Sequence, residues 1–136
     1  MILDYFTQMC LGLKHCHDRK IMHRDLKPDN IFLTRQDIVK LGDFGVSKVL
    51  NHTKAQAVTF TGTYPYISPE VWSRQPYNWK SDIWALGIVL YQMAALRPPF
   101  FCASIIDLQN LIIRGRYPDL PQMYSGGLKN IVALCL

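Results

Sequence analysis

Two short motifs carry the side chains with the clearest chemical use: residues 23–30 read HRDLKPDN, and residues 43–45 read DFG. Asp25 can orient a hydroxyl group and accept its proton. A free aspartate has a pKa near ~3.9 and is a weak base, so it would take the proton late in the reaction. Lys27 can neutralise a phosphoryl group in transit. These residue types suit phosphoryl transfer, whose loose transition state needs positioned charges and little covalent chemistry.

The same two motifs offer ligands for a hard cation. Asn30 supplies an amide oxygen and Asp43 a carboxylate, and magnesium accepts both. Asn and Asp are also frequent turn formers, so either residue alone would indicate only a turn. Because both motifs are present together, we expect Asn30 and Asp43 to hold magnesium.

The long segment after the DFG motif offers candidate sites for phosphorylation. Arg24, beside the proposed base, can receive a phosphorylated side chain, because a guanidinium group pairs with phosphate through two hydrogen bonds. Among the threonines of the segment we favour Thr59, with Thr61 next. We expect Thr63 to stay unmodified, with its hydroxyl bridging the aspartate and the lysine of HRDLKPDN.

The elements before the first motif are predicted from apolar spacing. Apolar residues recur at steps of three and four over residues 2–16, which predicts an amphipathic helix ending near residues 18–19. Ile21–Met22 then predicts a very short strand. Pro28 breaks any helix, so residues 23–30 are predicted to be loop.

The region between the motifs reads as a hairpin. Residues 31–33 and 38–41 are short apolar runs, rich in β-branched residues, on either side of a polar turn. Residues 46–70 carry no helical pattern, and long segments of this kind are usually functional or mobile.

Helices are predicted for the rest of the chain. Residues 79–95 are apolar nearly all round, which predicts a central buried helix. Ser104 and Asp107 resemble a capping box at the start of another helix. A last helix is predicted from Gly127 to Leu136. This order of elements predicts a mainly helical α+β unit with a small sheet.

Three residues are expected to have structural roles. Asp82 is a carboxylate in the apolar segment 79–95, and burial of an unpaired carboxylate is costly, so it must be paired or hydrogen-bonded. The alternative is an exposed first turn, where the helix dipole favours a negative charge. His23 and Phe44 are expected to stack in the core and to set the positions of the two loops.

Composition limits the class of protein. The chain has 136 residues, a net charge of +5 and 49% hydrophobic residues, which indicates one globular domain. No apolar run reaches the ~20 residues of a transmembrane helix, and the first residues do not resemble a signal peptide. We therefore expect a cytosolic or nuclear protein without a membrane partner. The basic residues form no run of five, which argues against a nucleic-acid partner. The four cysteines form no C-x-x-C pair and are expected to be buried thiols.

The motif pair resembles that of eukaryotic protein kinases. Lys27, two residues after Asp25, resembles the lysine found at this position in the serine/threonine class. Within that class the chain is similar to the NimA-related (NEK) family. Three features carry this similarity: Asn-Ile-Phe-Leu at residues 30–33, Leu-Gly before the DFG motif, and Ser-Pro-Glu at residues 68–70, where most kinases have Ala-Pro-Glu.

The resemblance implies a protein-kinase-like α+β fold in truncated form. Residues 1–136 would be the helical C-terminal lobe with its small hairpin, and the N-lobe sheet would be absent. Residues 23–30 would be the catalytic loop and residues 43–70 the activation segment. No glycine-rich phosphate loop and no strand lysine of the V-A-I-K type occur in the sequence. We therefore expect the 136-residue chain alone to have little or no kinase activity.

The resemblance also implies ligands and partners. ATP and Mg²⁺ would be bound, with Phe32 under the adenine ring, and the substrates would be Ser/Thr hydroxyls of proteins. Asp82 would bind the backbone of residues 23–24, and Glu70 would pair with an arginine that this sequence does not contain. NEK relatives imply a cytoplasmic protein, associated with the cytoskeleton or the cilium.

One departure from the family and two other functions remain open. Residues 62–66 read Gly-Thr-Tyr-Pro-Tyr instead of Gly-Thr-Pro-Tyr-Tyr, and this loop docks the peptide substrate. The main alternative is a non-catalytic, truncated kinase-like module that binds protein partners through its helical lobe. A small-molecule phosphotransferase is a weaker alternative, because the peptide-docking loop and Ser-Pro-Glu are present.

Overall fold

Helices and one hairpin make up the part of the chain that the computed structural model describes, residues 1–44 and 64–136. The elements are α1 (Ile2–Asp18), a 3₁₀ turn (Pro28–Asn30), β1 (Ile31–Leu33), β2 (Val39–Leu41), a second 3₁₀ turn (Tyr64–Tyr66), α2 (Pro69–Trp72), α3 (Trp79–Ala95), α4 (Ile105–Arg114) and α5 (Gly126–Cys135). The predicted helices and the hairpin are confirmed, and so is the mainly helical α+β architecture.

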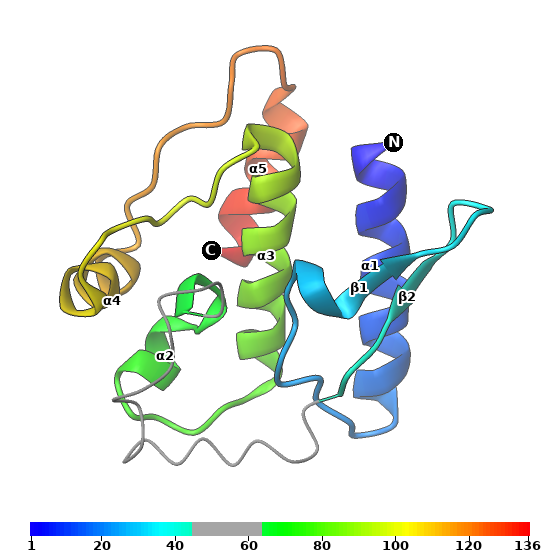
Figure 1. Cartoon of the computed structure of the whole chain (residues 1–136), viewed down its shortest axis with the longest axis horizontal. Coiled ribbons are helices and arrows are strands. Elements are labelled where there is room, and N and C mark those ends of the chain that lie inside the picture. Colours follow the sequence, from blue (N-terminus) through cyan, green and yellow to red (C-terminus); the bar gives the residue numbers. More distant parts are fainter. Residues whose placement is uncertain (45–63) are drawn as a thin grey trace.

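Helix α3 lies in the middle of the molecule, with α1 and the hairpin on one side and α2 and α4 on the other (Figure 1). Its start is fixed by a capping box, in which Asn78 Oδ1 accepts the Lys80 N–H at 2.7 Å and Ser81 Oγ accepts the Asn78 N–H. It ends at Leu96, whose φ of 56° is left-handed. Most of its residues are buried, as the apolar sequence predicts.

Helix α1 positions the hairpin. Its buried face consists of Phe6, Met9 and Leu13, and it packs against α3 and β2. β1 and β2 are antiparallel, with Phe32 opposite Lys40. The side chain of Gln8 in α1 accepts the backbone N–H of Val39 at 2.8 Å, so the hairpin is held to the helix by a hydrogen bond as well as by packing.

Three predictions for local structure are wrong. Ile21–Met22 is not a strand, because the Ile21 N–H is used by the Cys16 carbonyl at the end of α1. Residues 28–30 form a 3₁₀ turn instead of open loop, since the fixed φ of Pro28 suits the first position of a helical turn. α2 begins inside the segment predicted to lack helix; with four residues it is too short to show a periodic pattern.

Two apolar clusters flank α3. The larger joins α1, α3 and α5, and the smaller surrounds Trp84 and Phe100, whose rings stack with centroids 5.7 Å apart. In α4, Ser104 Oγ accepts the Asp107 N–H at 3.4 Å, so Ser104 caps the helix as predicted, although only this half of the predicted capping box is formed among the described contacts. None of the helices in residues 1–44 and 64–136 has the length and apolar content needed to cross a membrane.

Asp82 ties the first motif to α3. It is fully buried, with Oδ2 accepting the His23 N–H at 2.9 Å and Oδ1 accepting the Arg24 N–H at 3.0 Å. The ring nitrogen Nε2 of His17 lies 2.7 Å from Oδ2, and the Tyr77 hydroxyl donates to Oδ1. Burial, reinforced by the charge of Asp82, raises the pKa of Tyr77 well above its usual range, so this hydroxyl remains a donor.

We predict that Asp82→Asn lowers the free energy of unfolding by about 2–3 kcal/mol, the cost of one or two buried groups left without a partner. Each carboxylate oxygen accepts a backbone N–H. An asparagine NH₂ in either position would therefore face a donor. Urea unfolding of the 136-residue chain measures the effect. Asp18→Asn is the matched control, because Asp18 is exposed and pairs with Lys14 on the surface of α1. Equal effects of the two substitutions would contradict the prediction.

Gly87 allows α5 to approach α3. A Cβ atom at position 87 would lie 2.5 Å from the Cβ of Cys135 and 2.9 Å from Cδ2 of Leu136. Both distances are well below van der Waals contact, so a side chain here would push the two helices apart.

We predict that Gly87→Ala destabilises the chain by about 1–3 kcal/mol through overpacking, although alanine is the better helix former. The control is Gly126→Ala at the first residue of α5, where a Cβ would meet no atom within 4 Å. Thermal unfolding of both variants tests this difference. A Gly87→Ala chain as stable as the Gly126→Ala chain would show that α5 is not held at this distance.

Candidate active site

Asp25, Lys27 and Asn30 form one polar network in the loop after α1. Lys27 Nζ lies 3.2 Å from Asp25 Oδ2, and Asn30 Nδ2 donates to the same oxygen at 3.1 Å. Asn30 Nδ2 also donates to the Asp25 backbone carbonyl at 2.7 Å. The carboxylate is therefore oriented by a cation and by an amide, and the side chains of Asp25 and Lys27 are each 15% exposed, within reach of a substrate.

The backbone takes unusual conformations beside Asp25 and at Asp43. Arg24 has a φ of 68° and Asp43 has a φ of 50°, both in the left-handed region that residues other than glycine seldom adopt. Such positions cluster at functional sites, where the surrounding structure supports the strain. At Arg24 the support is the hydrogen bond from its N–H to the buried Asp82 carboxylate.

The two candidate magnesium ligands are brought together by the hairpin. The Gly42 N–H donates to the Asn30 carbonyl at 3.0 Å, which continues the β1–β2 ladder by one step, and Asp43 follows Gly42 directly. Because Asn30 uses Nδ2 to hold Asp25, Oδ1 is its atom that could ligate a cation. Asp43 is exposed.

This ligand set suits magnesium in the presence of a polyphosphate. Within the described part of the chain, no group of three His, Cys, Asp or Glu side chains could hold a metal alone. Magnesium usually takes one or two carboxylates from a protein and fills its remaining positions with water and phosphate oxygens. One carboxylate from Asp43 and one amide oxygen from Asn30 therefore fit a site that is completed by its substrate.

His23 lies beneath the site and contacts Phe44. The two ring centroids are 4.6 Å apart with an interplanar angle of 37°, and His23 has no exposed surface. Burial lowers the pKa of His23, with the Asp82 charge acting in the opposite direction, so the ring is neutral at pH 7. It accepts the Asp25 N–H on Nδ1 at 3.4 Å. Phe44 of the DFG motif thus packs against His23, the residue that precedes Arg24.

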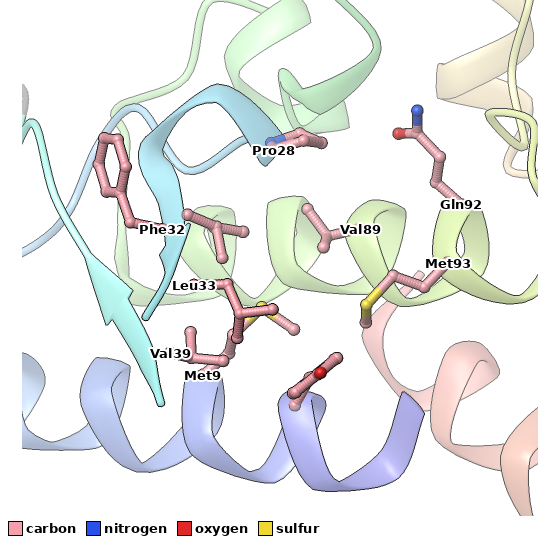
Figure 2. A pocket seen from close by; sticks show the side chains of 10 residues that line it. Met9, Pro28, Phe32, Leu33, Val39, Val89, Gln92 and Met93 are labelled. Carbon is pink, nitrogen blue, oxygen red and sulfur yellow. The ribbon is translucent and has the colours of Figure 1, made fainter. Parts of the chain in front are cut away.

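An apolar pocket lies between the hairpin, α1 and α3 (Figure 2). Its volume is about 280 Å³, and its described lining includes Met9, Phe32 and Val89 but none of the residues of the polar network. The Phe32 side chain is 50% exposed. This pocket is therefore a neighbour of the candidate active site, without groups for proton or phosphate transfer.

Of the remaining predicted site residues, Glu70 lies in the described part of the chain and three threonines lie outside it. Glu70 in α2 accepts a hydrogen bond of 2.5 Å from Ser81 Oγ at the start of α3. Thr59, Thr61 and Thr63 lie outside the described residues, so their relation to Arg24 remains a prediction.

Sequence reasoning missed three residues that support the site: His17 and Tyr77, which contact Asp82, and Ser81, which bonds to Glu70. Asn78, followed three residues later by Ser81, was a signal for the helix cap. No local pattern indicates a contact between His17 and Asp82, because these residues are 65 positions apart.

Known proteins resemble this chain over nearly its whole length. Residues 1–129 match the family model described as the protein kinase domain. The chain is 50% identical to the mouse (Mus musculus) serine/threonine-protein kinase Nek1 over 97% of its own length and 11% of the relative's. It is 47% identical to mouse Nek3 over 96% of the chain and 26% of the relative, and 46% identical to human (Homo sapiens) Nek2 over 99% and 32%.

The chain therefore spans about a tenth to a third of the length of these relatives. The protein kinase domain match covers nearly all of it and includes both sequence motifs. By this match the chain belongs to the protein kinase family, and its sequence is similar to those of the Nek serine/threonine-protein kinases.

Proposed function

We propose that residues 1–136 form the C-terminal lobe of a protein kinase domain that transfers the γ-phosphate of ATP to Ser/Thr hydroxyls of proteins. In this proposal residues 23–30 are the catalytic loop and residues 43–70 the activation segment. The observation that carries it is the convergence of Lys27 Nζ and Asn30 Nδ2 on one oxygen of Asp25, at 3.2 and 3.1 Å.

In the proposed reaction Asp25 orients the substrate hydroxyl towards the γ-phosphorus. The hydroxyl oxygen forms a bond to phosphorus while the bond to the β–γ bridging oxygen breaks, and the hydroxyl proton passes to Asp25. Because an aspartate is a weak base, the proton moves late. The bond from Asn30 to the Asp25 carbonyl holds the backbone of the base in place during this step.

Lys27 and the two proposed magnesium ligands would neutralise the negative charge of the phosphates. Lys27 Nζ lies 3.2 Å from Asp25 Oδ2, and its ammonium group would neutralise the phosphoryl oxygens. Asn30 Oδ1 and the Asp43 carboxylate would hold magnesium. A bound magnesium ion supplies charge neutralisation at the phosphate oxygens. Phe32 would provide an apolar surface under the adenine ring.

Partners and location follow from the similarity. The names of the relatives describe serine/threonine-protein kinases, so we assign protein substrates to this chain. Phosphorylated Thr59 or Thr61 would pair with Arg24. A cytoplasmic protein at the cytoskeleton or the cilium is the location that the family resemblance supports.

A non-catalytic binding module is not favoured. Such modules arise when the reacting residues are lost, whereas the base, the lysine and both ligand residues are present in this chain. The 42–50% identity to Nek kinases extends over nearly the whole sequence.

We predict that Asp25→Asn lowers the rate of phosphoryl transfer by about 10²–10⁴-fold, the usual contribution of a general base. The protein, in the full length that its gene encodes, is assayed with radiolabelled ATP, magnesium and a generic basic protein. A chimera in which residues 1–136 replace the matching segment of mouse Nek2 is assayed in the same way. Asp119→Asn, at an exposed position in the loop before α5, is the matched control and should leave the rate unchanged. A segment that supports transfer equally well with and without Asp25→Asn would refute the proposed role.

A further inference from the structure

Gly42, the residue before the DFG motif, is covered by the ring of Phe32. A Cβ atom at position 42 would lie 2.7 Å from Cε2 and 3.2 Å from Cδ2 of Phe32. Carbon atoms do not approach this closely without moving. The aromatic ring therefore occupies the space that any side chain at position 42 would need.

The hairpin register explains this contact. Phe32 is opposite Lys40, and Gly42 lies two residues beyond Lys40 on the same face of the strand. In an antiparallel pair, an aromatic side chain can reach its diagonal neighbour two residues along the opposite strand. In this geometry the Phe32 ring lies over Gly42 and packs against its backbone.

Backbone conformation is not the reason for glycine at this position. Among the described glycines only Gly115 has a positive φ, so the backbone of Gly42 would accept an alanine. The nearest obstacle is the outer edge of a side chain that is 50% exposed. Phe32 belongs to neither apolar core cluster of the described residues, so an added methyl group at position 42 would turn the Phe32 ring at little cost in stability.

Gly42 also lies between the two candidate magnesium ligands. Its N–H donates to the carbonyl of Asn30 at 3.0 Å, and Asp43 follows it directly. The supported ring and the ligand residues thus belong to one short piece of hairpin. A change in the ring position would alter the surface next to the bound phosphates without removing a ligand.

We propose that Gly42 is a positioning residue of the nucleotide site, which acts by leaving room for the Phe32 ring to lie over it. The inference rests on the proposed function, since it assumes that Phe32 faces the adenine. Glycine at position 42 then sets the orientation of the apolar surface on which the base packs.

The test is a double-mutant cycle on nucleotide affinity. Gly42→Ala, Phe32→Leu and the double variant are prepared in the protein at the full length that its gene encodes, and the Kd for Mg–ADP is measured by calorimetry. Gly42→Ala should weaken binding about two- to tenfold, the effect of a side chain held ~30° away from its rotamer. With Phe32→Leu already present, Gly42→Ala should change the Kd less than twofold, because leucine has no atom at the Cε2 position.

Two controls separate positioning from a structural defect. Gly126→Ala adds the same methyl group where no atom lies within 4 Å and should leave the Kd unchanged. The melting temperature of Gly42→Ala should stay close to that of the parent protein. In the parent, nuclear Overhauser contacts should join the Phe32 ring protons to the Gly42 Hα protons, and the ring contacts at residue 42 should be reduced by Gly42→Ala.

Several results would overturn the inference. These are an unchanged Kd for Gly42→Ala, an equal loss of affinity in both Phe32 backgrounds, and a parent protein that does not bind Mg–ADP. Failure of the proposed function is recognised separately. If the cycle shows coupling while the protein transfers no phosphate, the nucleotide surface is as inferred and the catalytic assignment of Asp25 is wrong.

Discussion

The structure depends on one buried carboxylate. Asp82 lies in the central helix and accepts the backbone N–H groups of His23 and Arg24, while His17 and Tyr77 contact the same two oxygens. A buried charge is tolerated only when its hydrogen-bonding capacity is filled, so each partner has a defined place. The HRDLKPDN loop is thus attached to α3 through the backbone N–H groups of His23 and Arg24.

The candidate site uses the same principle at its surface. Asn30 holds Asp25 through two hydrogen bonds from one nitrogen, which leaves its oxygen for a metal ion. One residue therefore links the position of the proposed base to the position of a proposed magnesium ligand. The backbone bond between Gly42 and Asn30 extends this link to Asp43. Positioning of this kind is what phosphoryl transfer requires, because little covalent chemistry is done by the protein.

Two glycines show that a missing side chain can have different consequences. At Gly87 the space belongs to the backbone-proximal Cβ of Cys135 in a packed core, so α5 would have to move as a whole. At Gly42 the space belongs to the edge of the half-exposed Phe32 ring, which can turn. A side chain at position 87 would therefore lower stability, whereas a side chain at position 42 would change the orientation of the Phe32 ring.

The sequence alone determined the chemistry and the regular elements. Periodic apolar residues predicted α1 and α3 with their observed bounds, and the hairpin followed from two short apolar runs. These patterns are local, since they reflect which face of an element is buried. The HRDLKPDN and DFG motifs likewise identified the residues suited to phosphoryl transfer. The wrong predictions concern segments of two to four residues, such as Ile21–Met22, which are too short to show a period.

Only the tertiary structure decided how these residues are held. Whether Asp82 is buried or exposed could not be settled from its position in the first turn of α3, because its partners come from α1, the HRDLKPDN loop and the segment before α3. The contact between Phe32 and Gly42 required the register of the hairpin, which sequence periodicity does not specify. Residue types and spacing determine which chemistry is available, whereas distances between residues far apart in the chain arise from packing around α3.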